Sequence, residues 1–179
     1  MKKVLLLAAA TLLMTAPAFA QVEPNKVSIG TINAKKQDKD AVFLNVEYSK
    51  EVWDGVEGVV EGRLVSSNQH LMKVGAQKTL ISDGFLTLNG RANLTQNFGK
   101  TSATGWSVEP TGTFMVDKAT VTLGYEFGDT FKSSLRDRIR TATVEVMYPF
   151  QAGDFGLRYE NAVGDRRETA VSLVYALKN

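Results

Sequence analysis

The chain has 179 residues, with 21 Lys and Arg against 19 Asp and Glu, a single histidine and no cysteine. The lack of cysteine excludes disulfide bonds, zinc–thiolate sites and thiol catalysis, and a single histidine excludes a two-histidine metal site within the chain. Without Lys2 and Lys3, which lie in a predicted leader, 19 basic residues face 19 acidic ones, so no basic field predicts a nucleic-acid partner. No metal ion and no cofactor is expected.

Residues 1–20 have the pattern of a secretory signal peptide. A charged start at Lys2 and Lys3 precedes an apolar run over 4–14, and an A-F-A sequence ends the segment as a cleavage site. The apolar run is shorter than the ~20 residues that a membrane-spanning helix needs. The sequence therefore predicts an exported protein with a signal peptide and one domain at 21–179.

Apolar and polar residues alternate through nearly all of this domain, which predicts β-strands with two unlike faces. In the segment GVEGVVEGRL, Val56, Val60 and Leu64 share one face, and Glu57 and Glu61 lie on the other. About ten strands are predicted, at 26–35, 41–49, 55–64, 70–77, 85–94, 107–116, 119–127, 141–150, 155–160 and 170–177.

The pair Asn89-Gly90 is a strong hairpin signal inside one of these segments. A turn there would leave two strands of about four residues, too short for the ~9–11 residues of a membrane strand. One continuous strand is the favoured interpretation, and a total of eight or twelve strands stays open.

The connections between the predicted strands differ in length. Those at SKE (49–51), SDG (82–84), DK (117–118) and QAGD (151–154) are tight, and the others are longer and polar. Short turns at one end and longer loops at the other, with both termini on the short-turn side, are typical of a transmembrane barrel. The predicted fold is an all-β, antiparallel, up-and-down transmembrane β-barrel.

Two orientations of the faces are compatible with the alternation. A soluble periplasmic barrel would bury the apolar face, whereas a membrane barrel turns it to lipid and collects aromatic residues at both ends. Aromatic residues lie near the predicted strand ends, so the membrane barrel is favoured. The predicted aromatic girdle comprises Tyr48, Trp53, Tyr148, Phe150, Phe155 and Tyr175 at the short-turn end and Trp106, Phe127 and Tyr159 at the long-loop end.

In a membrane barrel the polar face lines the lumen. Buried charges must pair or be hydrated. Direct pairing would plug the barrel, whereas water between the charges would leave a narrow, weakly selective pore. The predicted lumen-lining charges are Glu57, Glu61, Arg63, Lys73, Arg91, Glu109, Glu126, Glu145, Arg158 and Glu160.

The signal peptide, the strand rhythm and the closing sequence VSLVYALKN resemble those of small bacterial outer-membrane β-barrels of the porin-like or opacity-like kind. The resemblance is to an architecture and not to a specific motif. It implies a place in the outer membrane of a Gram-negative bacterium, with outer-membrane lipid, lipopolysaccharide and the barrel-assembly machinery as partners. A monomer is expected.

The favoured hypothesis for function is a porin-like passive channel for small solutes, with anionic solutes as an option. The alternative is a closed structural or adhesive barrel whose loops bind surfaces. The option of anionic solutes depends on basic loop residues, which are otherwise expected to contact anionic lipopolysaccharide. These residues are Lys132, Arg136, Arg138, Arg140, Arg166 and Arg167.

An enzyme is not predicted, and no residue is assigned a catalytic role. A lipid-modifying enzyme around His70, with Ser66 or Ser67 as nucleophile, is the least favoured hypothesis. Nothing near these residues in the sequence supplies the orienting third group of a catalytic triad.

Overall fold

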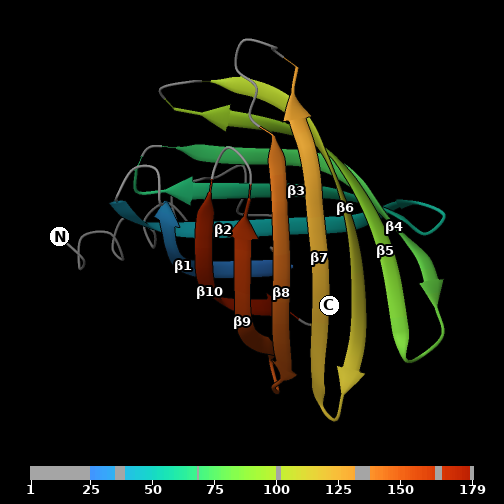
Figure 1. Ribbon diagram of the computed structural model, residues 1–179. Helices are drawn as coiled ribbons and strands as arrows, with labels where there is room; N and C mark the ends of the chain where they lie inside the picture. The colour runs from blue at the N-terminus through green and yellow to red at the C-terminus, as the bar shows by residue number, and fades with distance from the viewer. Residues whose placement is uncertain are drawn as a thin grey trace.

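The structure, a computed structural model, describes residues 25–34, 39–67, 69–99, 102–131, 138–163 and 167–177. The predicted signal peptide at 1–20 lies outside these residues. The described residues form a closed barrel in which every strand pairs antiparallel with its neighbours in sequence and β1 pairs with β10 (Figure 1). The strands are β1 (Lys26–Ala34), β2 (Lys39–Trp53), β3 (Val56–Val65), β4 (His70–Ser82), β5 (Leu86–Phe98), β6 (Ala103–Val116), β7 (Ala119–Thr130), β8 (Ile139–Pro149), β9 (Gly153–Ala162) and β10 (Glu168–Leu177).

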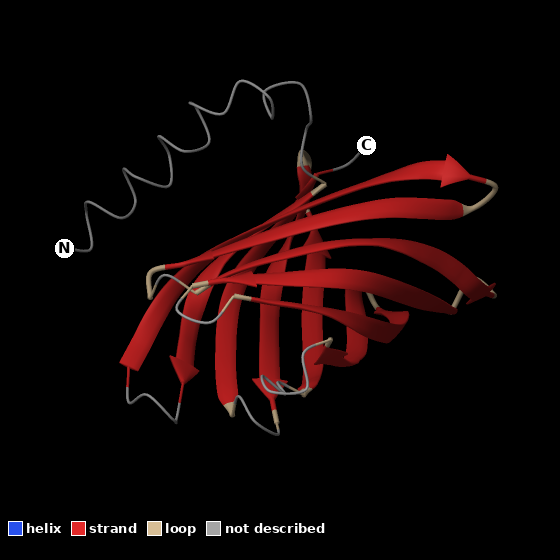
Figure 2. Cartoon of the chain, turned by 90° about the horizontal axis from the view of Figure 1, so that it is seen from above, coloured by secondary structure: helices blue, strands red, loops and turns tan. Residues whose placement is uncertain are grey.

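This architecture confirms the predicted all-β, up-and-down barrel and its count of about ten strands. In Figure 1 the upright strands β7–β9 cross the strands β2–β4 of the opposite wall, as closure of a tilted sheet requires. Seen at right angles to that view, the described part of the chain consists of strands and their connections (Figure 2). Within it, no helix is long and apolar enough to span a membrane.

Apolar side chains face outward and charged side chains face inward on the strands, which is the reverse of their distribution in a soluble protein. On β3 the side chain of Glu61 is only 5% exposed, whereas the neighbouring Val60 and Leu64 are 37% and 40% exposed. The same contrast recurs on β9 and β10, where Leu157 and Leu173 face outward at 56% and 47% exposure. Because large apolar residues are usually buried and carboxylates exposed in water, this arrangement fits a barrel that has lipid outside and a polar interior.

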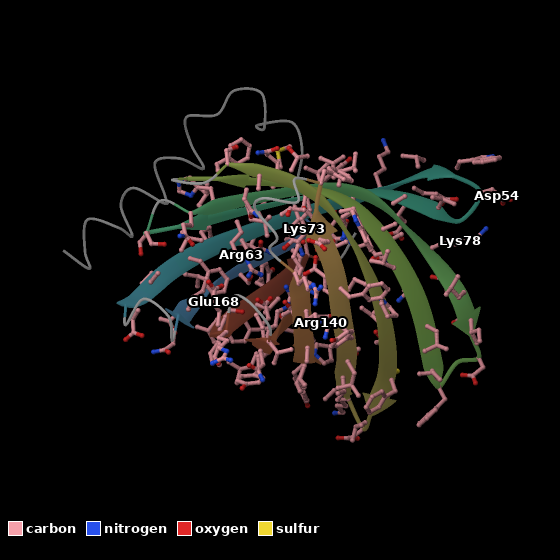
Figure 3. The ribbon with its side chains drawn as sticks, turned by 45° about the horizontal axis from the view of Figure 1, so that its top comes forward. Asp54, Arg63, Lys73, Lys78, Arg140 and Glu168 are labelled. Carbon is pink, nitrogen blue, oxygen red and sulfur yellow. The ribbon has the colours of Figure 1, made fainter. Side chains whose placement is uncertain are left out.

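Figure 3 shows this arrangement from another side. Arg63 and Lys73 lie in the centre of the barrel, whereas Asp54 and Lys78 lie at projecting hairpins. Strand β2 continues to Trp53, although its pairing with β1 ends at Glu47. The β2–β3 hairpin therefore extends beyond the end of β1.

The turn between β2 and β3 differs from the one predicted. SKE (49–51) was predicted as the turn, but these residues belong to β2, and the chain turns at Asp54 and Gly55. Both residues have positive φ, at 33° and 72°, the conformation that two-residue hairpins require and that an Asp-Gly pair adopts readily. The Asp-Gly pair was the decisive local signal, and it outweighs the polar character of the three residues before it.

The pair Asn89-Gly90 does not form a turn, which confirms one continuous strand. Strand β5 passes through it, with Gly90 opposite Lys78 on β4 and Pro110 on β6. A bulge on β4 between Thr79 and Ile81 places the side chain of Leu80 over the glycine, 3.4 Å from where a Cβ would stand. At that distance a Cβ would be in ordinary van der Waals contact with Leu80, so the Leu80 side chain packs directly over the glycine.

The β4–β5 turn is held by Asp83. Its carboxylate accepts hydrogen bonds from the backbone N–H groups of Phe85 at 3.0 Å and Leu86 at 2.7 Å. These two bonds hold the pKa of Asp83 below its ordinary value, because they favour the ionised carboxylate.

The structure describes three of the six predicted basic loop residues. Lys132, Arg136 and Arg166 lie beyond the described residues. Arg138, Arg140 and Arg167 are described and exposed at the long-loop end.

Candidate functional site

The interior charges are positioned by strand register. Residues opposite each other in an antiparallel pair share a face of the sheet. Lys26 lies opposite Glu47, Glu47 opposite Glu61, and Glu61 opposite Lys73. Four neighbouring strands, β1 to β4, thus carry a continuous row of charges into the lumen.

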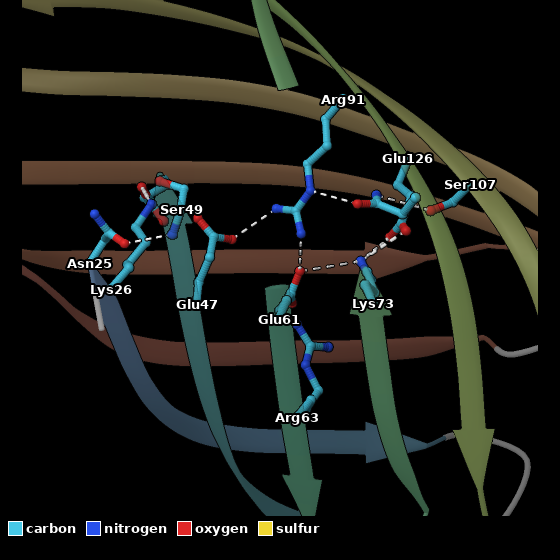
Figure 4. Close-up of polar contacts among 12 residues, drawn as sticks. Asn25, Lys26, Glu47, Ser49, Glu61, Arg63, Lys73, Arg91, Ser107 and Glu126 are labelled. Carbon is cyan, nitrogen blue, oxygen red and sulfur yellow. Dashed lines mark hydrogen bonds and ion pairs between the residues drawn. The ribbon is translucent and has the colours of Figure 1, made fainter. Parts of the chain in front are cut away.

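One group of ion pairs is centred on Arg91 of β5 (Figure 4). Its guanidinium donates to Glu47 at 2.8 Å, to Glu61 at 3.0 Å and to the side-chain oxygen of Asn93 at 2.8 Å. Glu47 and Glu61 come from β2 and β3, so these contacts reach past the intervening strand β4. The planar guanidinium donates in several directions at once, which suits it to this role.

Lys73 of β4 forms a second bridge across the lumen. Its ammonium lies 2.8 Å from Glu126 of β7 and 3.7 Å from Glu61. Both Lys73 and Glu126 are buried, and strands β5 and β6 separate them around the barrel wall. Glu61 therefore joins the contacts of Arg91 and Lys73 into one network.

A second network lies on the wall of β8 and β9. Arg158 contacts Glu145 at 2.6 Å and Glu160 at 3.7 Å. Lys26 of β1 reaches Glu145 at 2.5 Å, and Arg63 of β3 reaches Glu160 at 2.9 Å. Neither of these last pairs joins neighbouring strands, so they too cross the interior.

Arg63 also contacts an apolar cluster inside the barrel. Its guanidinium lies 4.9 Å from the centre of the Phe43 ring, within the distance of a cation–π interaction. Phe43 is buried with Ile32 and Val65 near the long-loop end. The alternation on β2 already places Phe43 on the inward face with Asn45 and Glu47, and this cluster makes that part of the lumen wall apolar.

A polar cavity of about 240 Å³ runs between the two networks. This is room for several water molecules, since each takes about 30 Å³ in the liquid. Its lining includes Ile139 and Glu168 at the long-loop end and Thr113 and Thr122 toward the short-turn end. Nearly half of the lining residues are charged: the bases are Lys26, Arg63, Lys73, Arg91 and Arg158, and the acids are Glu47, Glu61, Glu109, Glu126, Glu145, Glu160 and Glu168.

The structure places the predicted lumen charges as follows. Glu57 lies on the inward side of β3, opposite Gln77, but does not line the cavity. Sequence reasoning omitted Lys26, Glu47 and Glu168. Glu47 alternates with Phe43 and Asn45, so the period of two on β2 was a sufficient signal for it. The other predicted lumen charges line the cavity, namely Glu61, Arg63, Lys73, Arg91, Glu109, Glu126, Glu145, Arg158 and Glu160.

The predicted girdle residues lie on the outward face in two groups. At the long-loop end, Trp106 and Phe127 pack edge to face with ring centres 6.4 Å apart. At the short-turn end, Phe150 contacts both Tyr148 and Phe155 in the same way, at 6.0 and 6.4 Å. Trp53 and Tyr159 are exposed, and Tyr48 and Tyr175 are half-buried. Exposed aromatic residues that the prediction omitted are Phe85, Phe98, Tyr125 and Phe131.

Two residues of the enzyme hypothesis, His70 and Ser66, accept hydrogen bonds from the backbone. Nδ1 of His70 accepts a hydrogen bond from the Val65 N–H at 3.2 Å, and Oγ of Ser66 accepts one from the Val42 N–H at 3.0 Å. These bonds hold the β3–β4 connection against β2. In the part of the chain that the structure describes, no group of His, Asp and Glu side chains is arranged to hold a metal ion.

Comparison with known proteins shows similarity in fold. No model of a known protein family matches the chain, and no curated protein sequence matches it. The NanC porin superposes with a TM-score of 0.57 at 9% identity, covering 86% of this chain and 99% of the porin. The KdgM porin gives 0.50 at 11% identity, with coverages of 86% and 99%. The translocator domain of the autotransporter NalP from Neisseria meningitidis gives 0.50 at 8% identity, covering 97% of this chain and 95% of that domain.

Proposed function

We propose that the protein is a porin-like passive channel for small solutes in the bacterial outer membrane. The observation that carries this proposal is the polar cavity whose lining reaches from Glu168 at one end of the barrel to Thr113 and Thr122 toward the other. Two structures of the same fold, NanC and KdgM, are described as porins. Side chains alone can fill the interior of a barrel of about eight strands. This barrel has ten strands and is therefore wider.

The surroundings of the barrel belong to the same proposal. The outward apolar belt and its aromatic ends are suited to outer-membrane lipid, and exposed Arg138, Arg140 and Arg167 are suited to the phosphates of lipopolysaccharide. Residues 1–20 would direct export and be removed, and the barrel-assembly machinery would insert residues 21–179 as a monomer. No catalytic residue is needed for passive permeation.

A closed structural barrel is the second candidate, and a specific observation favours it. The pairs Arg91–Glu47, Lys73–Glu126, Lys26–Glu145 and Arg63–Glu160 cross the lumen and occupy part of its section. Rigid cross-links of this kind would stiffen the barrel and narrow any path for solutes.

Two measurements in sequence separate these candidates. The full-length chain is expressed, and its outer membranes are run unheated and boiled on a denaturing gel, where a membrane barrel is expected to shift on boiling. The purified, heat-shifting protein is then inserted into a planar bilayer. Steps of ohmic current are expected for a channel. A folded barrel that inserts without passing current would establish the closed structure.

Removing a lumen arginine is expected to change the ion preference of the channel. Arg91→Ala deletes one positive charge from the cavity lining and leaves Glu47 and Glu61 without its guanidinium. Charged side chains that line a pore set its selectivity, so the reversal potential under a salt gradient should shift toward that of a cation-preferring channel. Arg63→Ala should shift it in the same direction.

The matched control is Arg140→Ala, which removes an exposed arginine at the long-loop end. It should leave the reversal potential near that of the unmodified protein. If the Arg63→Ala and Arg91→Ala channels also kept the reversal potential of the unmodified protein, Arg63 and Arg91 would not line the conducting path.

A further inference from the structure

The charges of the cavity do not balance. Its lining holds five basic and seven acidic side chains. Each of the five bases is within ion-pair distance of at least one lining carboxylate. The carboxylates used in this way are Glu47, Glu61, Glu126, Glu145 and Glu160. Glu168 at the long-loop end has contacts of its own.

Glu109 of β6 is the acid that remains. Its register partner across β5–β6 is Arg91, but the guanidinium of Arg91 turns to Glu47, Glu61 and Asn93 instead. Among the described residues Glu109 forms no hydrogen bond or ion pair, although Lys73 and Arg91 are near enough to act on it electrostatically. Its carboxylate therefore has no direct counter-ion among the described residues.

The space around Glu109 is lined by small side chains. A Cβ on Gly124 would stand 3.6 Å from Oε1 of Glu109, and it would also meet the methyl group of Thr111 and the Cβ of Thr143. Gly124, Thr111 and Thr143 all line the cavity with Glu109. The glycine and the threonines leave the carboxylate accessible from the cavity.

We propose that Glu109 makes the lumen prefer cations, and that the permeant solutes are small cations, whether inorganic or carrying an ammonium group. This inference rests on the proposed channel function. A charge in a narrow cleft with walls of low dielectric raises the local concentration of counter-ions. The excess of two acids over bases in the lining acts in the same direction, and Glu109 is the part of it that a solute reaches.

Reversal potentials under a KCl gradient test the proposal. The unmodified channel should pass K⁺ in preference to Cl⁻. Glu109→Gln, which keeps the shape of the side chain and removes its charge, should lower this preference by about fivefold, the ratio that corresponds to about 1 kcal/mol for one unit charge near a hydrated ion. Glu57→Gln is the control, because Glu57 lies on the same inward side of the barrel but outside the cavity lining.

A chemical measurement gives a second readout that does not need current. The chain has no cysteine, so Thr111→Cys introduces a single thiol beside Glu109. In outer membranes, a cationic methanethiosulfonate reagent should label this thiol faster than an anionic reagent of similar size. Combining Thr111→Cys with Glu109→Gln should reduce that ratio.

The outcomes distinguish a failure of the proposed channel function from a failure of the inference about Glu109. A folded barrel that passes no current removes the channel function, whereas a conducting barrel that prefers anions, or whose selectivity and labelling ratio do not respond to Glu109→Gln, overturns the inference about Glu109 alone.

Discussion

Replacing Leu157 with arginine should cost about 2–4 kcal/mol of folding free energy in a lipid bilayer, the range for a basic residue on the lipid face near the midplane. Leu157 lies on the outward face of β9 and is paired with Val146 of β8 and Leu173 of β10. All three side chains belong to the apolar belt. The loss would be measured as a shift of denaturant-induced unfolding of the protein in lipid vesicles.

The control is the same substitution at a different depth. Leu177 ends β10 at the short-turn side, and Leu177→Arg should cost only about 0–1 kcal/mol because an arginine near the interface remains hydrated. A soluble barrel would behave differently, since an arginine on a face exposed to water has little effect. Equal, small effects at both positions, together with recovery of the protein from the soluble periplasm, would contradict a lipid-facing belt.

Lys73→Met should destabilise the barrel by about 3–5 kcal/mol, the cost of leaving one member of a buried ion pair alone. Lys73 is 5% exposed and its partner Glu126 is 8% exposed, so the carboxylate would keep its charge in the interior without the nearest ammonium. Thermal unfolding followed by the heat shift on a gel, and denaturant unfolding in vesicles, measure this loss.

The double variant Lys73→Met with Glu126→Gln tests the cause of that loss. If the cost comes from an uncompensated carboxylate, neutralising Glu126 should recover most of the stability, because replacing a buried pair by neutral groups is often close to neutral. Glu61, which also lies near Lys73, has a second cation in Arg91 at 3.0 Å, so neither substitution should leave it without a counter-ion. A double variant as unstable as Lys73→Met alone would show that the packing of the Lys73 side chain, and not its charge, stabilises the barrel.

Much of the fold could be read from the sequence because alternation reports directly on a two-faced strand. Val60 and Glu61 are adjacent, and their opposite environments follow from the period of two. The same rule carried the interpretation through Asn89 and Gly90, where strand length outweighed a local turn signal. The prediction is wrong at residues 49–51, where three polar residues suggest a turn although the Asp54-Gly55 pair, which forms it, lies just beyond.

The pairing of charges could not be predicted in this way. Alternation assigns Lys73 and Glu126 to the inside, but it does not say that β4 and β7 face each other across the lumen. Which strands face each other depends on the tilt of the strands and on the total register shift, or shear, around the barrel. Lys26 was missed for a similar reason, because the alternation of its strand breaks at Thr31 and Ile32 and its partner, Glu145, lies 119 residues further along the chain.

The contact between Lys26 and Glu145 bears on how the barrel closes. Lys26 is the first residue of β1, the strand whose pairing with β10 completes the ring. A slip of one residue along that seam would turn every side chain of β1 to the opposite face. The Lys26 ammonium would then leave the lumen, and Glu145 would lose one of its two cations. The ion pair between Lys26 and Glu145 therefore stabilises the observed register of the β1–β10 seam against a one-residue slip.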